Sequence, residues 1–261
     1  MNHLSNSYRI ILIFLGLFLC NLMGHPSAIE ANCPTTVTVK HILKKVFPGE
    51  RMEIGKIEPA ETPGICKVQI KEQNRYRLLY TDLKGEFILA GNIFEAKSKK
   101  NLTREATLCL NKLTAGDLLH LETLTGFSLG QGKEVVYFVA DPKCPYCKQV
   151  EPILKKMAKK DGVQIRYLLF PLDSHKGARE QVISILCDKK GLEGLGNEYK
   201  SNNQCSEGAK KVDETVSFLQ KKGIFGTPTF IFSDGINILG MIPEDELRTR
   251  LRTSKANVTK K

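Results

Sequence analysis

Residues 134–147 read Glu-Val-Val-Tyr-Phe-Val-Ala-Asp-Pro-Lys-Cys-Pro-Tyr-Cys, and this stretch decides the fold of the C-terminal half. Its beginning, Glu134–Ala140, is almost entirely apolar, which is typical of a strand buried on both faces of a sheet. Asp141, Pro142 and Lys143 end the strand, and a helix is predicted to follow Cys144. The segment therefore predicts a buried strand that turns directly into a helix bearing two cysteines.

A second apolar strand is predicted over Gln164–Phe170. Strand, helix and strand form a βαβ unit, so the two strands should be parallel with a right-handed crossover. Residues 175–222 look mainly helical. The chain then predicts a hairpin of Thr229–Ser233 with Ile236–Met241, followed by a last helix from Pro243. This order predicts an α/β domain with a helical insertion, over residues 129–261.

A small α+β domain is predicted before it, at residues 29–100. The pattern predicts a helix over Thr35–Phe47, packed on an antiparallel meander. Its strands are Ile54–Ile57, Ile65–Ile70, Tyr76–Tyr80 and Phe87–Ala90. Residues 101–128 predict a helical linker, with Thr103 as its candidate N-terminal cap.

The spacing of Cys144 and Cys147 predicts redox chemistry. Cys144 would lie at the N-terminal end of the helix, where free backbone N–H groups and the helix dipole favour a thiolate. Pro145 suits the first helical position, because the missing N–H costs nothing there. Cys147, about one turn deeper, can attack a mixed disulfide and release the substrate. Cys144 and Cys147 are therefore the candidate catalytic residues.

A metal site is the main alternative interpretation of this spacing. A closed zinc site needs four ligands, however, and the sequence has no second Cys-x-x-Cys and no histidines at ligand spacing. A purely structural disulfide would close too small a loop to add much stability. We predict neither a metal nor a cofactor.

Gly226-Thr227-Pro228 enters another apolar strand. Proline lacks the N–H that a strand donates, so its place at the start of a strand requires a reason. A simple loop stop is one explanation. The other is a cis peptide bond that turns the Thr227 backbone towards the cysteine pair, ready to bind an extended substrate. With the cysteine motif upstream, we predict the cis bond.

The N-terminus predicts export. Arg9 precedes an apolar run from Ile10 to Leu22, and small residues follow it. This order describes a secretory signal peptide, and the run is shorter than the ~20 residues of a membrane-spanning helix. We expect residues 1–28 to be removed and the rest to act outside the cytoplasm, although an uncleaved anchor remains the alternative.

The net charge of +11 at first favours a nucleic-acid partner. The lysines are scattered in short pairs, however, and aromatic residues do not alternate with them to form a stacking surface. We expect a solvated basic surface and no nucleic-acid partner.

Taken together, these residues resemble the thioredoxin superfamily, and the whole mature chain resembles the bacterial DsbC/DsbG-type disulfide isomerases. The firmest points are Cys144-x-x-Cys147, Gly226-Thr227-Pro228, and Tyr80-x-Asp82 with Gly91 and Asn101-Leu-Thr. The resemblance implies a homodimer joined through the N-terminal domains. It also implies two redox sites that face a cleft for misfolded protein, with Tyr146, Thr227 and Pro228 binding substrate.

The remaining cysteines form a second set of expectations. Cys187 and Cys205 resemble the structural disulfide of the family. Cys33 and Cys66 could join the first helix to a strand of the N-terminal domain. Cys109 would be left over, either as a buried thiol or as a contact between two linkers in the dimer.

Two departures from the family bear on activity. Pro145-Tyr146 stands where Gly-Tyr is common, which leaves the balance of oxidase and isomerase activity open. Phe138 stands where cytoplasmic thioredoxins keep a buried acid, which disfavours a general reductase.

We therefore expect a periplasmic thiol:disulfide isomerase that acts on unfolded or misfolded exported proteins. A membrane-embedded thiol reductase would donate the electrons that reduce its cysteine pair again. A dithiol oxidase is the rival enzyme, and a holdase whose apolar cleft matters more than its thiols is the rival binding protein.

Overall fold

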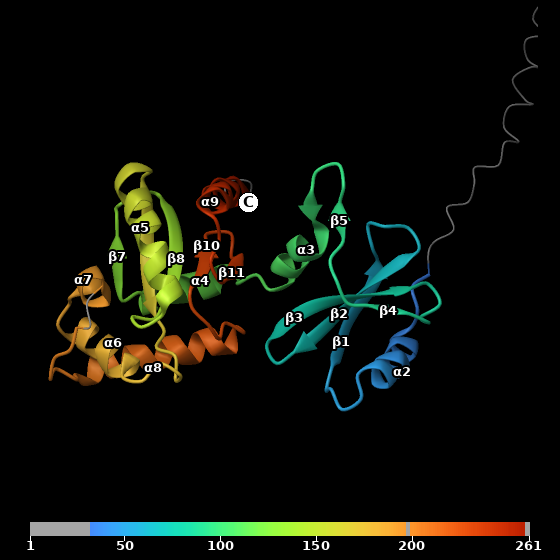
Figure 1. The fold of residues 1–261 in the computed structure, drawn as a ribbon, viewed down its shortest axis with the longest axis horizontal. Helices are drawn as coiled ribbons and strands as arrows, with labels where there is room; N and C mark the ends of the chain where they lie inside the picture. The colour runs from blue at the N-terminus through green and yellow to red at the C-terminus, as the bar shows by residue number, and fades with distance from the viewer. Residues whose placement is uncertain (1–31, 197–198, 259–261) are drawn as a thin grey trace, which may run out of the picture.

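The computed structural model describes residues 32–196 and 199–258. Its chain forms two bodies, one from each half of the sequence (Figure 1). The predicted signal peptide, residues 1–28, lies outside the described residues. Within the described ranges, no helix is both long and apolar enough to cross a membrane.

The N-terminal body is one helix on an antiparallel sheet, as predicted. Helix α2 (Thr36–Val46) begins at Thr35, whose hydroxyl accepts a hydrogen bond from the Thr38 N–H. Its buried residues Val39 and Leu43 pack in one cluster with apolar side chains of the sheet. The sheet order is β1-β2-β3-β4, formed by β1 (Glu53–Pro59), β2 (Ile65–Glu72), β3 (Arg75–Asp82) and β4 (Ile88–Leu89).

The sequence missed a short hairpin that follows the meander, and it misassigned a helix cap. The hairpin consists of β5 (Phe94–Glu95) and β6 (Lys100–Asn101), and it leads into α3 (Leu102–Leu110). The cap of α3 is Asn101, whose side chain accepts from the Arg104 N–H. Thr103 is buried instead, and its hydroxyl lies 2.6 Å from the Tyr80 hydroxyl. The prediction of Thr103 as the cap is wrong because asparagine caps at least as well as threonine, and Asn101 comes first.

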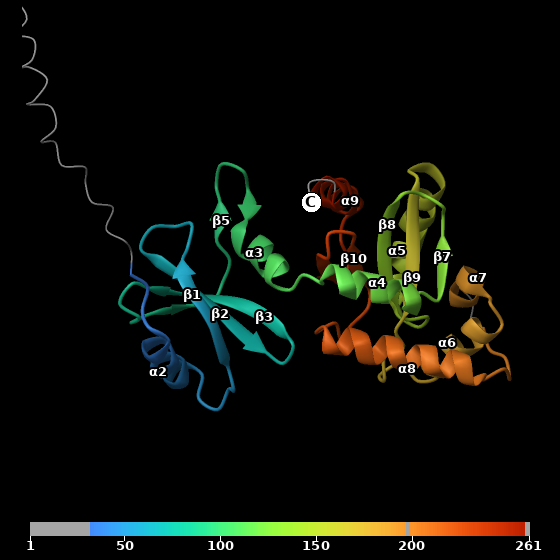
Figure 2. The same cartoon turned by 180° about the vertical axis from the view of Figure 1, so that it is seen from behind.

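The predicted helical linker consists of two helices that belong to different bodies. Helix α3 contacts β3 of the N-terminal sheet. Helix α4 (Ala115–Leu124) begins at a capping box of Thr114 and Asp117. It buries Leu121 and Leu124 in the core of the C-terminal body. The chain therefore passes between the bodies at residues 111–114 (Figures 1 and 2).

The C-terminal body is built on a five-stranded sheet of order β11-β10-β8-β9-β7. Strands β8 and β9 are parallel and joined by α5, which confirms the predicted βαβ unit. Strands β10 and β11 form the predicted antiparallel hairpin. The sequence did not reveal the short β7 at the edge. The elements are β7 (Phe127–Leu129), β8 (Glu134–Ala140), α5 (Pro145–Lys160), β9 (Val163–Leu169), α6 (Ala178–Cys187), α7 (Gly191–Gly196), α8 (Ser206–Lys221), β10 (Thr229–Phe232), β11 (Asn237–Leu239) and α9 (Glu244–Val258).

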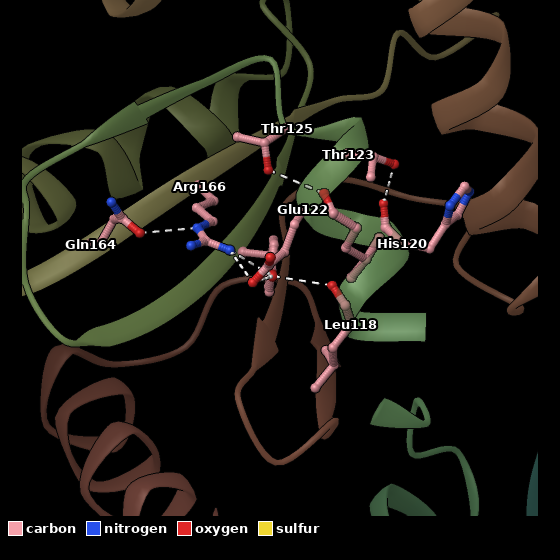
Figure 3. A network of polar contacts seen from close by, with 9 residues as sticks. Leu118, His120, Glu122, Thr123, Thr125, Gln164 and Arg166 are labelled. Carbon is pink, nitrogen blue, oxygen red and sulfur yellow. Dashed lines mark hydrogen bonds and ion pairs between the residues drawn. The ribbon is translucent and has the colours of Figure 1, made fainter. Parts of the chain in front are cut away.

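Polar contacts fix α4 against the sheet (Figure 3). The Tyr137 hydroxyl donates to the Leu118 carbonyl at 3.2 Å. Arg166 on β9 donates to the Tyr137 hydroxyl at 3.0 Å and to the Glu122 carboxylate at 2.6 Å. Because β8 and β9 each hold one member of this network, α4 is tied to the same two strands that carry α5.

The two bodies touch through a set of hydrogen bonds and ion pairs. Arg75, the first residue of β3, donates to the Gly223 carbonyl at 3.3 Å and to Asn237 at 3.0 Å. The Asn237 amide donates in turn to the Asn111 carbonyl at 2.7 Å. Ion pairs between α3 and α9 join Arg104 to Glu246 and Arg250 to Glu105. The N-terminal body is thus attached next to the loop that precedes β10.

A disulfide joins Cys187 and Cys205 in the helical insertion, with 18 residues of sequence separation. The first turn of α8 fits closely over it, since a Cβ at Gly208 would lie 2.6 Å from the Cys187 sulfur. The bond therefore fixes α6 and α8 at one point.

Replacing both Cys187 and Cys205 by serine should lower the free energy of unfolding by about 3 kcal/mol, because the unfolded chain regains the entropy of the open loop. Urea unfolding followed by circular dichroism measures this change. The control is Cys109→Ser, which removes an exposed free thiol and should change the free energy by less than about 0.5 kcal/mol. A double variant as stable as the parent chain would contradict the assigned role.

Candidate active site

The junction of β8 and α5 places two free thiols at the C-terminal end of the central strand of the sheet. Cys144 is the N-cap residue of α5 and Pro145 is its first helical residue. The Cys144 N–H donates to the Asp141 carbonyl at 3.2 Å, which forms the turn between strand and helix. Cys144 is only 2% exposed, and its Sγ donates to the Thr227 carbonyl at 3.6 Å.

The loop before β10 forms the other side of this contact. The Thr227–Pro228 peptide bond is cis, as the sequence predicts. Strand β10 pairs with β8 with Thr229 opposite Val139, so the loop before it lies beside the end of β8. The Thr229 hydroxyl donates to the Gly226 carbonyl at 2.8 Å and closes the loop on itself. The sheet thus brings together residues that are far apart in the sequence.

The second thiol differs from the first in its surroundings. Cys147 lies in the first turn of α5 and is 5% exposed. Burial raises the pKa of the Cys147 thiol well above its usual range, and the nearby Cys144 sulfur raises this pKa further. A Cys147 held as the neutral thiol is a poor first nucleophile, because the thiolate is the reactive form.

Apolar side chains are exposed around the cysteine pair. Tyr146, between the two cysteines, is 56% exposed. Phe225, just before the cis-proline loop, is also exposed. Strand β11 contributes exposed Leu239, followed by Met241, and the Gly240 N–H between them donates to the Pro228 carbonyl. We call these exposed side chains at the cysteine motif, the cis-proline loop and β11 the apolar rim.

Asp141 is a buried carboxylate at the site that the sequence analysis treated only as a strand breaker. It accepts hydrogen bonds from the backbone N–H groups of Lys143 and Leu172, at 2.6 and 2.7 Å. It also lies 3.0 Å from Nδ1 of His175. These contacts attach the cysteine turn to the loop after β9. An acid immediately after a buried strand and before a reactive motif is the signal that could have revealed it.

The other cysteines lie away from this site. Cys33 is bonded to Cys66 of β2, and Cys187 to Cys205. Cys109 on α3 is an exposed free thiol, so of its two expected roles the buried one is wrong. Helix α3 leaves this side chain on its outer face. Among the described residues, no group of three or more histidine, cysteine, aspartate or glutamate side chains could hold a metal ion.

Comparison with known proteins connects this geometry to a family. The model of the disulfide bond isomerase protein N-terminal domain matches residues 27–104, and that of the thioredoxin-like domain matches residues 128–255. A Bordetella avium protein described as a probable thiol:disulfide interchange protein DsbC is 32% identical over 224 residues, which cover 84% of this chain and 75% of that protein.

Other matches are weaker. The thiol:disulfide interchange protein DsbC of Escherichia coli K12 is 24% identical over 199 residues, which cover 74% of this chain and 78% of that protein. Among solved structures, the catalytic domain of Proteus mirabilis ScsC aligns at a TM-score of 0.45 and 18% identity, covering 54% of this chain and 98% of that one. The two matched domains and the Bordetella relative confirm the resemblance seen in the sequence. The chain belongs to the DsbC family of thiol:disulfide interchange proteins, and it is a thiol–disulfide oxidoreductase with a thioredoxin-like domain.

Proposed function

We propose that this chain is a periplasmic thiol:disulfide isomerase in which Cys144 is the attacking thiol. One observation carries the proposal: the Cys144 sulfur lies at the N-terminus of α5 and 3.6 Å from the Thr227 carbonyl of the cis-proline loop. The helix N-terminus stabilises a thiolate through its free N–H groups and its dipole. The loop offers backbone groups beside the sulfur to an extended substrate.

The reaction begins when the Cys144 thiolate attacks one sulfur of a wrong disulfide in the substrate. The substrate S–S bond breaks, a mixed disulfide with Cys144 forms, and the other substrate sulfur leaves as a thiolate. A third substrate thiol can then attack the substrate sulfur of the mixed disulfide. This forms a new pairing, releases Cys144 as the thiolate, and consumes no net oxidant.

Cys147 can also resolve the mixed disulfide. It attacks the Cys144 sulfur, which releases a reduced substrate and leaves Cys144 and Cys147 joined. A membrane-embedded thiol reductase would then return two electrons to the pair. The neutral state of the Cys147 thiol suits this later role, because it does not compete with Cys144 for the first attack.

Substrate binding is assigned to the apolar rim around the site, with Tyr146, Thr227 and Pro228 in contact with the polypeptide. Unfolded and misfolded exported proteins expose the apolar segments that such a rim binds. A signal peptide at residues 1–28 would deliver the chain to the same compartment.

Isomerase activity also requires that the two sites of a dimer share one cleft, and we assign dimerisation to residues 29–100. Support comes from the family of this region and from its edge strand. Strand β4 lies at one edge of the sheet, with Phe87 and Leu89 67% and 55% exposed. An edge strand offers unpaired backbone groups to a second copy of the chain.

A dithiol oxidase is the second candidate, favoured by one departure in the site. Pro145-Tyr146 stands between the cysteines, and the residues at this position alter the stability of the thiolate. A more stable Cys144 thiolate would make the enzyme a stronger oxidant of its substrates. A holdase is the third candidate, since the apolar rim could bind a client without any thiol chemistry.

Alkylation of the fully reduced chain at about pH 6 should label Cys144 before Cys147, because Cys147 remains protonated and buried at that pH. Peptide mass spectrometry after a time course with iodoacetamide measures the order. As a second readout, Cys147→Ser should accumulate a mixed disulfide with a scrambled substrate, whereas Cys144→Ser should form none. Preferential labelling of Cys147 would reverse the assignment of the two thiols.

Leu89→Lys should convert a dimer of the full chain into a monomer, because it places a charge in the proposed contact. Sedimentation equilibrium measures the mass. The matched control is Leu119→Lys on α4, which changes another exposed leucine on the other body. The interface assignment is wrong if Leu89→Lys stays dimeric, or if the Leu119→Lys variant dissociates as well.

A further inference from the structure

The attack of Cys147 on the mixed disulfide requires a proton acceptor, and the sheet does not provide one. The thiol must lose its proton to attack, yet burial raises its pKa. Phe138, the inward-facing residue of β8 near the motif, is a hydrocarbon side chain only 1% exposed. The acceptor must therefore come from another element packed around Cys147.

A small cavity lies behind Cys147 and contains a candidate. Its wall includes Phe138, Cys147, Glu151, Tyr167 and Leu195. The volume open to the centre of a water molecule is about 10 Å³. That is room for about one water molecule, provided that polar groups are present to bind it. The cavity thus connects the buried thiol to a carboxylate.

Glu151 lies on the same face of α5 as Cys147, since residues four apart on a helix are neighbours. Its side chain is only 14% exposed. On its outer side it forms an ion pair with Lys155 at 2.6 Å. The carboxylate therefore lies between solvent and the cavity, where it can take a proton from one side and return it to the other.

Tyr167 gives independent evidence that the cavity is a polar site. It is 1% exposed on β9, and its hydroxyl has no hydrogen-bond partner among the residues that the structure describes. Burial raises the pKa of this hydroxyl, and the charges of Glu151 and Cys147 raise it further. The Tyr167 hydroxyl therefore lies near both the Glu151 carboxylate and the Cys147 sulfur. A buried hydroxyl without a partner is costly unless the cavity supplies one.

The other charged groups around the cavity are less suitable acceptors. The Asp141 carboxylate is fully buried and already binds two backbone N–H groups and His175. Lys148 lines the cavity and carries a positive charge, as does Lys155 outside it. A lysine ammonium group has no free electron pair with which to accept a further proton.

We propose that Glu151 accepts the proton of Cys147 through this cavity when Cys147 resolves the mixed disulfide. The proton passes from the Cys147 sulfur to the Glu151 carboxylate, by way of one water molecule. The Cys147 thiolate then attacks the Cys144 sulfur, the Cys144–Cys147 bond forms, and the bond from Cys144 to the substrate breaks. The substrate sulfur leaves as a thiolate with the electron pair and takes a proton from solvent, to which Glu151 returns its own. The inference rests on the proposed roles of the two cysteines.

Glutathione disulfide with a dye on each half separates the two steps in the full chain. Attack by Cys144 releases the first dye, and resolution by Cys147 releases the second. E151Q should slow the second release about a hundredfold at pH 7, which is within the usual range for loss of a general base. The difference in second-release rate between E151Q and the wild type should shrink as pH rises, because hydroxide replaces the carboxylate as base. The first release should stay unchanged.

The matched control is K155Q, which removes the ion pair of Glu151 but keeps the carboxylate. The rate of the second release in K155Q should stay within about twofold of the wild-type rate, because an ion pair with a solvent-exposed lysine contributes little. The inference is overturned if E151Q releases the second dye at the wild-type rate from pH 6 to 9, or if K155Q slows it as much as E151Q does. If E151Q fails to fold, E151D replaces it. A slower second release in E151D with an unchanged first release supports the proposal, and equal rates overturn it.

A different result would show that the proposed roles of Cys144 and Cys147 are wrong. If the wild-type chain releases no first dye, or if Cys144→Ser releases it normally, then the roles of the cysteines are wrong. Either result rejects the roles of the two cysteines before any Glu151 variant is measured.

Discussion

The antiparallel pairing of β10 with β8 is the contact on which the site depends. Strand β8 ends at the turn that holds Cys144, and β10 begins directly after Pro228. Since Thr229 pairs with Val139, the cis-proline loop must lie beside the cysteine turn. The 3.6 Å contact between the Cys144 sulfur and the Thr227 carbonyl follows from this register. A shift of one residue would exchange the faces of β10 and move the loop away from the sulfur.

The same central strands also give the two thiols different surroundings. Helix α5 begins at the end of β8, so Cys144 is its N-cap residue and Cys147 lies in its first turn, and both side chains are buried. Burial raises the pKa of the Cys147 thiol, whereas Cys144 lies at the N-terminus of the helix. Two identical side chains three positions apart thereby acquire different chemistry. Asp141 supports this arrangement by joining the cysteine turn to the loop after β9.

Sequence reasoning succeeded where one periodic pattern dominates. The apolar run of Glu134–Ala140 predicted β8 with its observed bounds, and the helix over α2 was predicted to within one residue at each end. It failed where a contact distant in sequence decides the outcome. Strand β7 has only three residues and forms because β9 is available to pair with it. Thr103 is buried because Tyr80 and Ile93 bind its hydroxyl, which no local pattern reveals. Glu151 and Tyr167 meet at the cavity only once α5 packs on β9.

We assign this chain to disulfide reshuffling rather than to net oxidation, and the redox state of the Cys144–Cys147 pair in living cells distinguishes the two directly. An isomerase begins each cycle with a free Cys144 thiolate, so a reductase must keep the pair as thiols. Cells are quenched in acid, free thiols are alkylated with a mass tag, and the tags on Cys144 and Cys147 are counted by mass spectrometry. For an isomerase, we expect most of the protein to carry tags on both cysteines. A pair that is mostly joined as a disulfide would contradict it and identify the chain as an oxidase.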